Sequence, residues 1–260
     1  MTIQITTQLL KDLRDATGVS VMQCKKALEE AEGDIEKAKM ILKSKSKAAA
    51  EKKADRDAKD GIVVVVNGNG KSVMLTLNCE TDFVARNEEF VNLAQKLAEI
   101  ALAEGVAKMQ ESAPEMIAEI VQKIGEKIEV GKVEVVDGMT LGSYVHGGKK
   151  AVVVALSGGT SELAKDIAMH IAAMNPSYIK RSDVDQNEEI KAKEIFEKEL
   201  EGSDKPADIK EKILKGKIDT FFKEQTLLDQ SFIKNPDLTV GTLLQNSGAT
   251  IEKFIKESIG

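Results

Sequence analysis

Tryptophan is absent from this 260-residue chain, and aromatic residues make up only 3% of it. Surfaces that bind single-stranded nucleic acid commonly stack bases on aromatic side chains, so the scarcity of aromatic residues argues against such a surface. The formal net charge is -6, so no overall positive charge attracts nucleic acid either. We therefore expect no direct nucleic-acid partner.

Long apolar runs and paired cysteines are also missing. The longest apolar runs, residues 62–66 and 151–156, are far too short to span a bilayer, and residues 1–4 do not begin an export signal. Cys24 and Cys79 are distant in sequence and lack metal-ligand spacing. The sequence predicts a soluble cytoplasmic protein with reduced thiols and no membrane partner.

Histidine, the commonest acid–base residue, occurs only twice. His170 lies beside the apolar face of a predicted helix, where we expect a packed and hydrogen-bonded side chain. His146 ends a predicted strand, but the sequence identifies no Ser, Cys or carboxylate partner for it. Zinc and calcium motifs are absent from the sequence. We expect no catalytic residue, cofactor or metal, and hence no enzyme.

Residues 1–55 predict a small N-terminal domain with a linker helix. Three short amphipathic segments follow the capping residues Thr6 or Thr7, Ser20 and Asp34, which predicts a three-helix bundle of the ubiquitin-associated type. From residue 43 to 59 the chain is rich in Lys, Ala and Ser. This stretch is either an RNA-binding arm or a solvated helical connector, and the lack of interleaved aromatics favours the connector.

Residues 56–139 predict the first of two related sheet-and-helix subdomains. Two β-branched runs flank an Asn-Gly turn at 67–70, which is typical of a β-hairpin. Two amphipathic helices follow, the second beginning at Pro114. Alternating residues at 128–136 then predict a returning strand.

The same order of hairpin and helix recurs in the second half of the chain. Strands at 141–146 and 151–156 flank Gly147-Gly148, and Ser161 caps the helix that follows. A last helix and a strand at 250–255 complete this second subdomain, which we assign to residues 140–182 and 226–260.

Residues 183–225 interrupt the second subdomain. Two charged amphipathic helices separated by the loop 202–206 predict an inserted antiparallel helical hairpin of coiled-coil type. The predicted fold class is therefore α+β: a three-helix bundle, then two related antiparallel-sheet-plus-helix subdomains, the second carrying the hairpin.

The turn between the first hairpin and the helix after it holds the residues that a purely structural role explains least. Asp82 or Asn87 can cap the helix, and Cys79 suits a buried strand position. Phe83 is an aromatic residue in a polar turn. It is either a core anchor or an apolar wedge displayed to a partner, and the pattern alone leaves both open.

Several runs resemble the elongation factor Ts family, the guanine nucleotide exchange factors of elongation factor Tu. The first is Thr81-Asp82-Phe83-Val84-Ala85-Arg86-Asn87, which is similar to a family signature. The second is the run from Thr17 to Leu28, which is similar to the other signature. The likeness extends nearly from end to end, through these further runs: Lys123 to Glu126, Gly142 to His146 and His170 to Ala172.

The resemblance implies the same fold and a role in translation elongation, without covalent chemistry. In the family, a four-residue motif dislocates the magnesium of elongation factor Tu; here it corresponds to Thr81, Asp82, Phe83 and Val84. The residues that match partner-binding positions are Arg14, Val21, Met22, Lys25, Ile124, Gly125 and His146. A homodimer and a 2:2 complex with elongation factor Tu are both compatible with the resemblance.

The chain also departs from the family pattern. Ile233-Lys234 stands where many members have an apolar pair. The sequence stops at Gly260, short of the C-terminal helical module that the resemblance leads us to expect. Two other function classes stay open on the residues alone. One is a chaperone-like binding protein that leaves GDP release unchanged. The other is an enzyme built around His146 and Cys79, which would need a ligand pocket and a reactive thiol.

Overall fold

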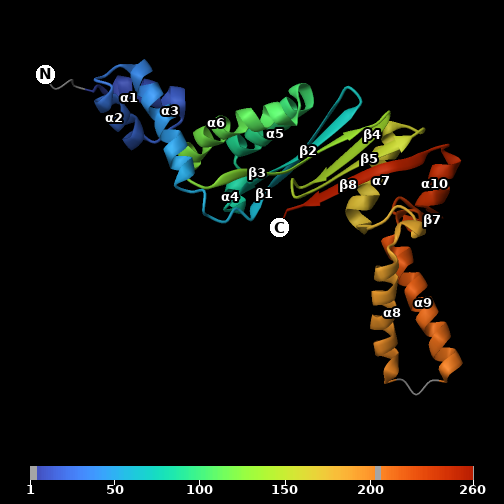
Figure 1. The fold of residues 1–260 in the computed structure, drawn as a ribbon. Helices are drawn as coiled ribbons and strands as arrows, with labels where there is room; N and C mark the ends of the chain where they lie inside the picture. The colour runs from blue at the N-terminus through green and yellow to red at the C-terminus, as the bar shows by residue number, and fades with distance from the viewer. Residues whose placement is uncertain (1–4, 203–205, 260) are drawn as a thin grey trace. The chain divides into compact units, whose positions relative to one another are not determined.

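The computed structural model describes residues 5–202 and 206–259 and confirms the predicted α+β fold (Figure 1). The chain divides into two compact units. One contains the residues up to 135 together with 147–151 and those from 257 onward; the other contains 136–146 and 152–256. In the described ranges, no helix is both long enough and apolar enough to cross a membrane.

Three helices form the N-terminal bundle: α1 (Thr7–Thr17), α2 (Val21–Glu30) and α3 (Ile35–Glu51). The side chains of Thr6, Ser20 and Asp34 accept the predicted capping hydrogen bonds, which satisfy backbone N–H groups in each first turn. Leu13 and Leu28 lie in a core that the solvent does not reach.

The stretch predicted as a solvated helical connector is helical up to Glu51, where it continues α3. The helix runs unbroken to Glu51, and Ala50 packs against the core of the first sheet. The side-chain amide of Gln122 donates a hydrogen bond to the Leu42 carbonyl at 3.1 Å. Part of the connector is therefore packed rather than solvated.

The first sheet has the order β1-β2-β3, with β1 (Asp60–Gly68), β2 (Lys71–Cys79) and β3 (Ile128–Asp137). β1 and β2 pair antiparallel, with Asp60 opposite Cys79 and Gly68 opposite Lys71. Asn69 and Gly70 both have positive φ in the tight turn between them. The predicted Asn-Gly hairpin is thus confirmed.

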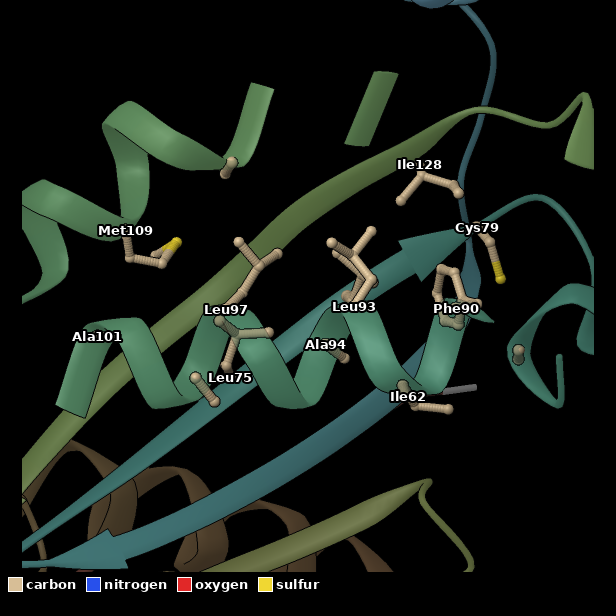
Figure 2. Packing of buried hydrophobic residues seen from close by; sticks show 14 of the residues in the cluster. Ile62, Leu75, Cys79, Phe90, Leu93, Ala94, Leu97, Ala101, Met109 and Ile128 are labelled. Atoms are coloured by element: carbon tan, nitrogen blue, oxygen red, sulfur yellow. The ribbon is translucent and has the colours of Figure 1, made fainter. Parts of the chain in front are cut away.

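The core beneath the first sheet lies between that sheet and two helices, α5 (Glu88–Glu104) and α6 (Val106–Ile124). Figure 2 shows Phe90, Leu93 and Leu97 along α5, beside Leu75 and Cys79 of the sheet. The prediction that α6 begins at Pro114 is wrong, because Pro114 lies inside the helix. Burial of Met109 and Val121 on either side keeps the helix continuous despite the missing N–H.

The second sheet has the order β4-β5-β8, with β4 (Thr140–His146), β5 (Lys150–Ser157) and β8 (Thr250–Ser258). Helix α7 (Ser161–Met174) packs against β4, and its cap is Thr160 rather than the predicted Ser161. A short pair of strands, β6 (Ser231–Phe232) and β7 (Asn235–Thr239), precedes α10 (Val240–Asn246). The sequence did not predict this pair.

The inserted hairpin consists of α8 (Gln186–Glu201) and α9 (Ala207–Gln225), as predicted (Figure 1). Phe196 and Phe221 meet edge to face with ring centroids 5.8 Å apart. At the base, two 3-10 turns flank the helices, at Arg181–Asp183 and Leu227–Asp229. The predicted loop at 202–206 includes residues 203–205, which lie outside the described residues, as do residues 1–4.

Candidate functional site

The predicted turn after β2 contains a short helix, α4 (Asp82–Ala85), that the sequence did not predict. Thr81 is its cap, because the Thr81 hydroxyl accepts a hydrogen bond from the Val84 N–H at 3.4 Å. Asn87 then caps α5 by accepting from the Glu89 N–H at 2.9 Å. We call residues 79–87 the elbow. It is a sequence of capped turns, not a loose loop.

Glu126 binds the elbow from the turn between α6 and β3. Its Oε2 accepts hydrogen bonds from the backbone N–H groups of Glu80 at 3.1 Å and Thr81 at 3.0 Å. Its Oε1 accepts a third from the Thr81 hydroxyl at 2.7 Å. Gly125 makes this reach feasible by ending α6 with a φ of 89°, a conformation that favours glycine.

Glu80 makes a reciprocal contact with the same turn. Its Oε1 accepts a hydrogen bond from the Lys127 N–H at 2.6 Å and another from the Arg56 guanidinium at 3.1 Å. The Lys127 backbone N–H, with a further contribution from Arg56, holds the pKa of Glu80 below its usual value. The elbow and the α6–β3 turn are therefore joined by carboxylates from both sides.

Cys79 lies at the start of the elbow and is fully buried. Its thiol donates a hydrogen bond to the Thr81 carbonyl at 3.2 Å. Burial, together with the negative charges of Asp60 and Glu126, raises the pKa of the Cys79 thiol to about 12. A nucleophilic cysteine needs the opposite shift, so Cys79 does not support the enzyme alternative.

Phe83 is displayed at the surface of the elbow. Its side chain is 83% exposed, whereas Val84 and Ala85 of the same helical turn are buried. The core-anchor alternative for Phe83 is therefore wrong. Asp82 is half-buried and pairs with Arg86 at 3.0 Å. The elbow thus holds an unpartnered aromatic ring on a short, hydrogen-bonded scaffold.

Ile124 and Gly125 lie at the end of α6, directly before the Glu126 carboxylate that holds the elbow. The α1–α2 loop comes close to the same helix end. A Cβ added at Gly18 would lie 3.1 Å from the Cε atom of Lys123. Lys123 in turn pairs with Glu89 of α5 at 2.8 Å.

The predicted partner-binding residues of the bundle are all at its surface. On α2, Met22 is 63% exposed and Val21 is 41% exposed. Arg14 and Lys25 are exposed as well, and Lys25 lies 3.9 Å from Glu29. Exposed apolar side chains beside exposed cations form a surface suited to binding another protein.

His146 belongs to the second unit, at the end of β4. Its side chain is exposed, and its Nδ1 lies 3.0 Å from the Tyr144 hydroxyl. His170 is buried and hydrogen-bonded, as predicted. In residues 5–202 and 206–259, no three His, Cys, Asp or Glu side chains gather as metal ligands would.

Three residues of this site were not singled out from the sequence: Arg56, Glu80 and Glu126. Glu126 lies in one of the runs that resemble the family, but nothing local indicates its role. Its partners are 45 and 46 positions away in the chain.

Comparison with known proteins identifies the family of the chain. The family described as Elongation factor TS matches residues 80–260. Elongation factor Ts of Hahella chejuensis is 43% identical over 263 residues, which cover 98% of this chain and 92% of the relative. Elongation factor Ts of Francisella tularensis subsp. novicida is 42% identical over 266 residues with the same coverage. This chain belongs to the elongation factor Ts family.

Proposed function

We propose that this protein is a guanine nucleotide exchange factor of translation elongation, acting in the cytoplasm. It binds elongation factor Tu in its GDP form and promotes GDP release, so that GTP can enter. The observation that carries the proposal is the exposed Phe83 on a capped and hydrogen-bonded elbow. Membership of the elongation factor Ts family supports the identity of the partner.

An aromatic ring on a fixed support is well suited to enter a partner's pocket. Aromatic side chains dominate the binding energy of many protein interfaces when they fill desolvated pockets. Because the elbow is already ordered, little conformational entropy is lost on binding. Phe83 would therefore enter an apolar pocket beside the nucleotide site of the GTPase, with Asp82 anchoring the intrusion.

Exchange then follows from thermodynamic linkage. A factor that binds the GTPase more tightly when its magnesium and phosphate contacts are disturbed must weaken GDP binding by the same factor. Magnesium is the largest local positive charge holding the nucleotide, so its displacement weakens the phosphate contacts. The factor makes and breaks no covalent bond, and it needs no cofactor of its own.

The other predicted residues would bind the partner away from the nucleotide. We assign Arg14, Val21, Met22 and Lys25 to a docking surface, and Ile124 and Gly125 to support of the elbow. His146 would add a contact from the second unit. A homodimer or a 2:2 complex would be compatible with this arrangement, and neither nucleic acid nor membrane takes part.

The test is the rate at which fluorescent GDP leaves purified elongation factor Tu, with and without this protein. We expect acceleration by the parent and much less by Phe83→Ala. Met139→Ala is the matched control, because Met139 is 99% exposed and has no assigned role. Tight binding without any acceleration would favour the chaperone-like alternative and overturn the proposal.

A further inference from the structure

We infer that Glu126 is a positioning residue for Phe83, because its carboxylate fixes the elbow in the conformation that displays the ring. The inference rests on the proposed function and deepens it. The hydrogen bonds of Glu126 go to Glu80 and Thr81 and not to the displayed ring. Glu126 acts through the backbone and the cap of the helical turn that carries the ring.

The three hydrogen bonds to Glu126 converge on the two residues directly before α4. They come from the Glu80 N–H, the Thr81 N–H and the Thr81 hydroxyl, at 3.1, 3.0 and 2.7 Å. A carboxylate accepts such bonds more strongly than a neutral group does. Both backbone donors and the only side-chain donor of this segment are thus satisfied by one side chain.

The bond to the Thr81 hydroxyl also orients the helix cap. A threonine hydroxyl has one proton and two acceptor lone pairs. Since Thr81 donates that proton to Glu126, its lone pairs are free to accept from the Val84 N–H at 3.4 Å. The carboxylate is therefore linked to α4 through a chain of two hydrogen bonds.

Helix α4 needs this external support because it has only four residues. One helical turn is not stable by itself, since nucleation costs more conformational entropy than one hydrogen bond returns. Burial of Val84 and Ala85 anchors one side of the turn, but Phe83 contributes nothing to the core. The direction of the Phe83 side chain therefore depends on how firmly the start of α4 is held.

The elbow is also attached to the α6–β3 turn through Glu80, so changing Glu126 should have only a local effect. Glu80 remains bonded to the Lys127 N–H and to Arg56, so the chain stays attached to the α6–β3 turn. Loss of Glu126 should loosen the elbow without unfolding the unit. A loosened elbow must be ordered when it binds, which slows GDP release.

Glu126→Gln is the most informative substitution because it keeps size and shape. The amide oxygen of glutamine still accepts hydrogen bonds, but its NH2 group would face the N–H or O–H groups that now donate to the carboxylate. We expect Glu126→Gln to slow factor-dependent GDP release about tenfold, in keeping with the loss of charge-assisted hydrogen bonds. Thr81→Val removes the hydroxyl bond to Glu126 and the cap of α4 but leaves both backbone bonds in place, so it should slow release in the same direction.

A double-mutant cycle tests whether Glu126 acts through Phe83. If it does, adding Glu126→Gln to Phe83→Ala should change the release rate less than about twofold, because coupled residues are not additive. Independent slowing in the Phe83→Ala background would overturn the inference. So would an unchanged rate for Glu126→Gln alone, provided that Phe83→Ala is slow.

The two native thiols report on the elbow without reference to the partner. Cys79 is bonded to Thr81 within the elbow, and Cys24 is buried in the bundle. We expect Thr81→Val, which breaks the hydroxyl link to Glu126 but keeps the negative charge that raises the Cys79 pKa, to raise the alkylation rate of Cys79 severalfold, read by mass spectrometry, while Cys24 is unaffected. An equal rise at both thiols, or none at Cys79, would overturn the positioning role.

The GDP-release and alkylation measurements together separate failure of the inference from failure of the proposed function. If the parent does not accelerate GDP release, the proposed function fails, and thiol reactivity still shows whether Glu126 holds the elbow. Suppose that the parent accelerates release and Phe83→Ala does not. A Glu126→Gln variant that releases GDP as fast as the parent then refutes only the positioning role.

Discussion

The Nδ1 atom of His170 accepts a hydrogen bond from the backbone N–H of Ile233 at 3.2 Å. An accepting nitrogen carries no proton, so the buried ring is neutral and its Nε2–H donates to the Gln230 side chain at 2.8 Å. The ring also lies beside Phe232, with centroids 5.9 Å apart. His170 thus attaches the small β6–β7 pair to α7.

This arrangement predicts a pH-dependent stability. Burial lowers the pKa of His170, although the Gln230 hydrogen bond opposes the shift. Below about pH 6.5, the unfolded chain takes up a proton at this position that the folded chain resists. Stability should therefore fall as the pH falls from about 6.5 to the folded-state pKa. The measurement is the thermal midpoint of the parent between neutral and mildly acidic pH.

His170→Gln is the control for this pH effect. It should lower stability by about 1–3 kcal/mol at neutral pH, because Ile233 and Gln230 lose a buried partner. The additional loss at acidic pH should be smaller than in the parent. Parallel pH profiles for the two proteins would contradict the assignment to His170.

Truncation of two phenylalanines seven positions apart should have very different effects on the unfolding free energy. Phe90→Ala removes a fully buried side chain from the first core and should cost about 3–5 kcal/mol of unfolding free energy. Phe83→Ala removes an exposed ring and should change it by less than about 0.5 kcal/mol. Urea denaturation followed by circular dichroism measures both. A large loss for Phe83→Ala would contradict the exposed position of its ring.

Two glycines should be sensitive to substitution for different reasons. A Cβ at Gly142 would lie 2.2 Å from the Lys165 backbone nitrogen, so Gly142→Ala should cost about 1–3 kcal/mol through overpacking against α7. Gly125 has open space around it but a φ of 89°, so Gly125→Ala should cost about 1–2 kcal/mol through backbone strain.

Asparagine distinguishes these two causes. It tolerates positive φ, so Gly125→Asn should recover part of the loss seen with alanine, whereas Gly142→Asn should be worse than Gly142→Ala. Calorimetric melting of the four variants tests this ranking. The reverse order at either position would refute the assigned cause.

The docking surface predicts that Met22→Asp weakens binding to elongation factor Tu by about tenfold or more, as for a central apolar contact. Titration calorimetry measures the affinity. Met139→Asp introduces the same charge at another exposed methionine and should leave the affinity unchanged. Equal affinities for Met22→Asp and the parent would remove α2 from the interface.

Local signals in the sequence predicted most of the fold. The caps Thr6, Ser20 and Asp34, and the turn at Asn69-Gly70, depend on neighbours within a few residues. Such signals fail where tertiary packing overrides them. Pro114 is a common first residue of helices, yet buried residues on both sides of it extend α6 by two turns toward the N-terminus.

Long-range pairs explain what the sequence did not predict. The hydrogen bonds between Thr81 and Glu126 join residues whose proximity depends on the assembled sheet and helices. The exposure of Phe83 is a similar case. Whether an aromatic side chain in a turn is buried or displayed depends on the elements around it, and the pattern of the turn alone left both alternatives open.

The strand order of the second sheet has a consequence for the way in which the chain acquires its structure during synthesis. A tight turn joins β1 to β2, and residues 80–127 separate β2 from β3, so the first sheet closes over a shorter stretch of chain than the second. β5 lies beside β8, however, and residues 158–249 separate the two strands. A nascent chain therefore exposes an unpaired edge of β5 until the ribosome has delivered β8, and that edge is where premature association between chains would begin.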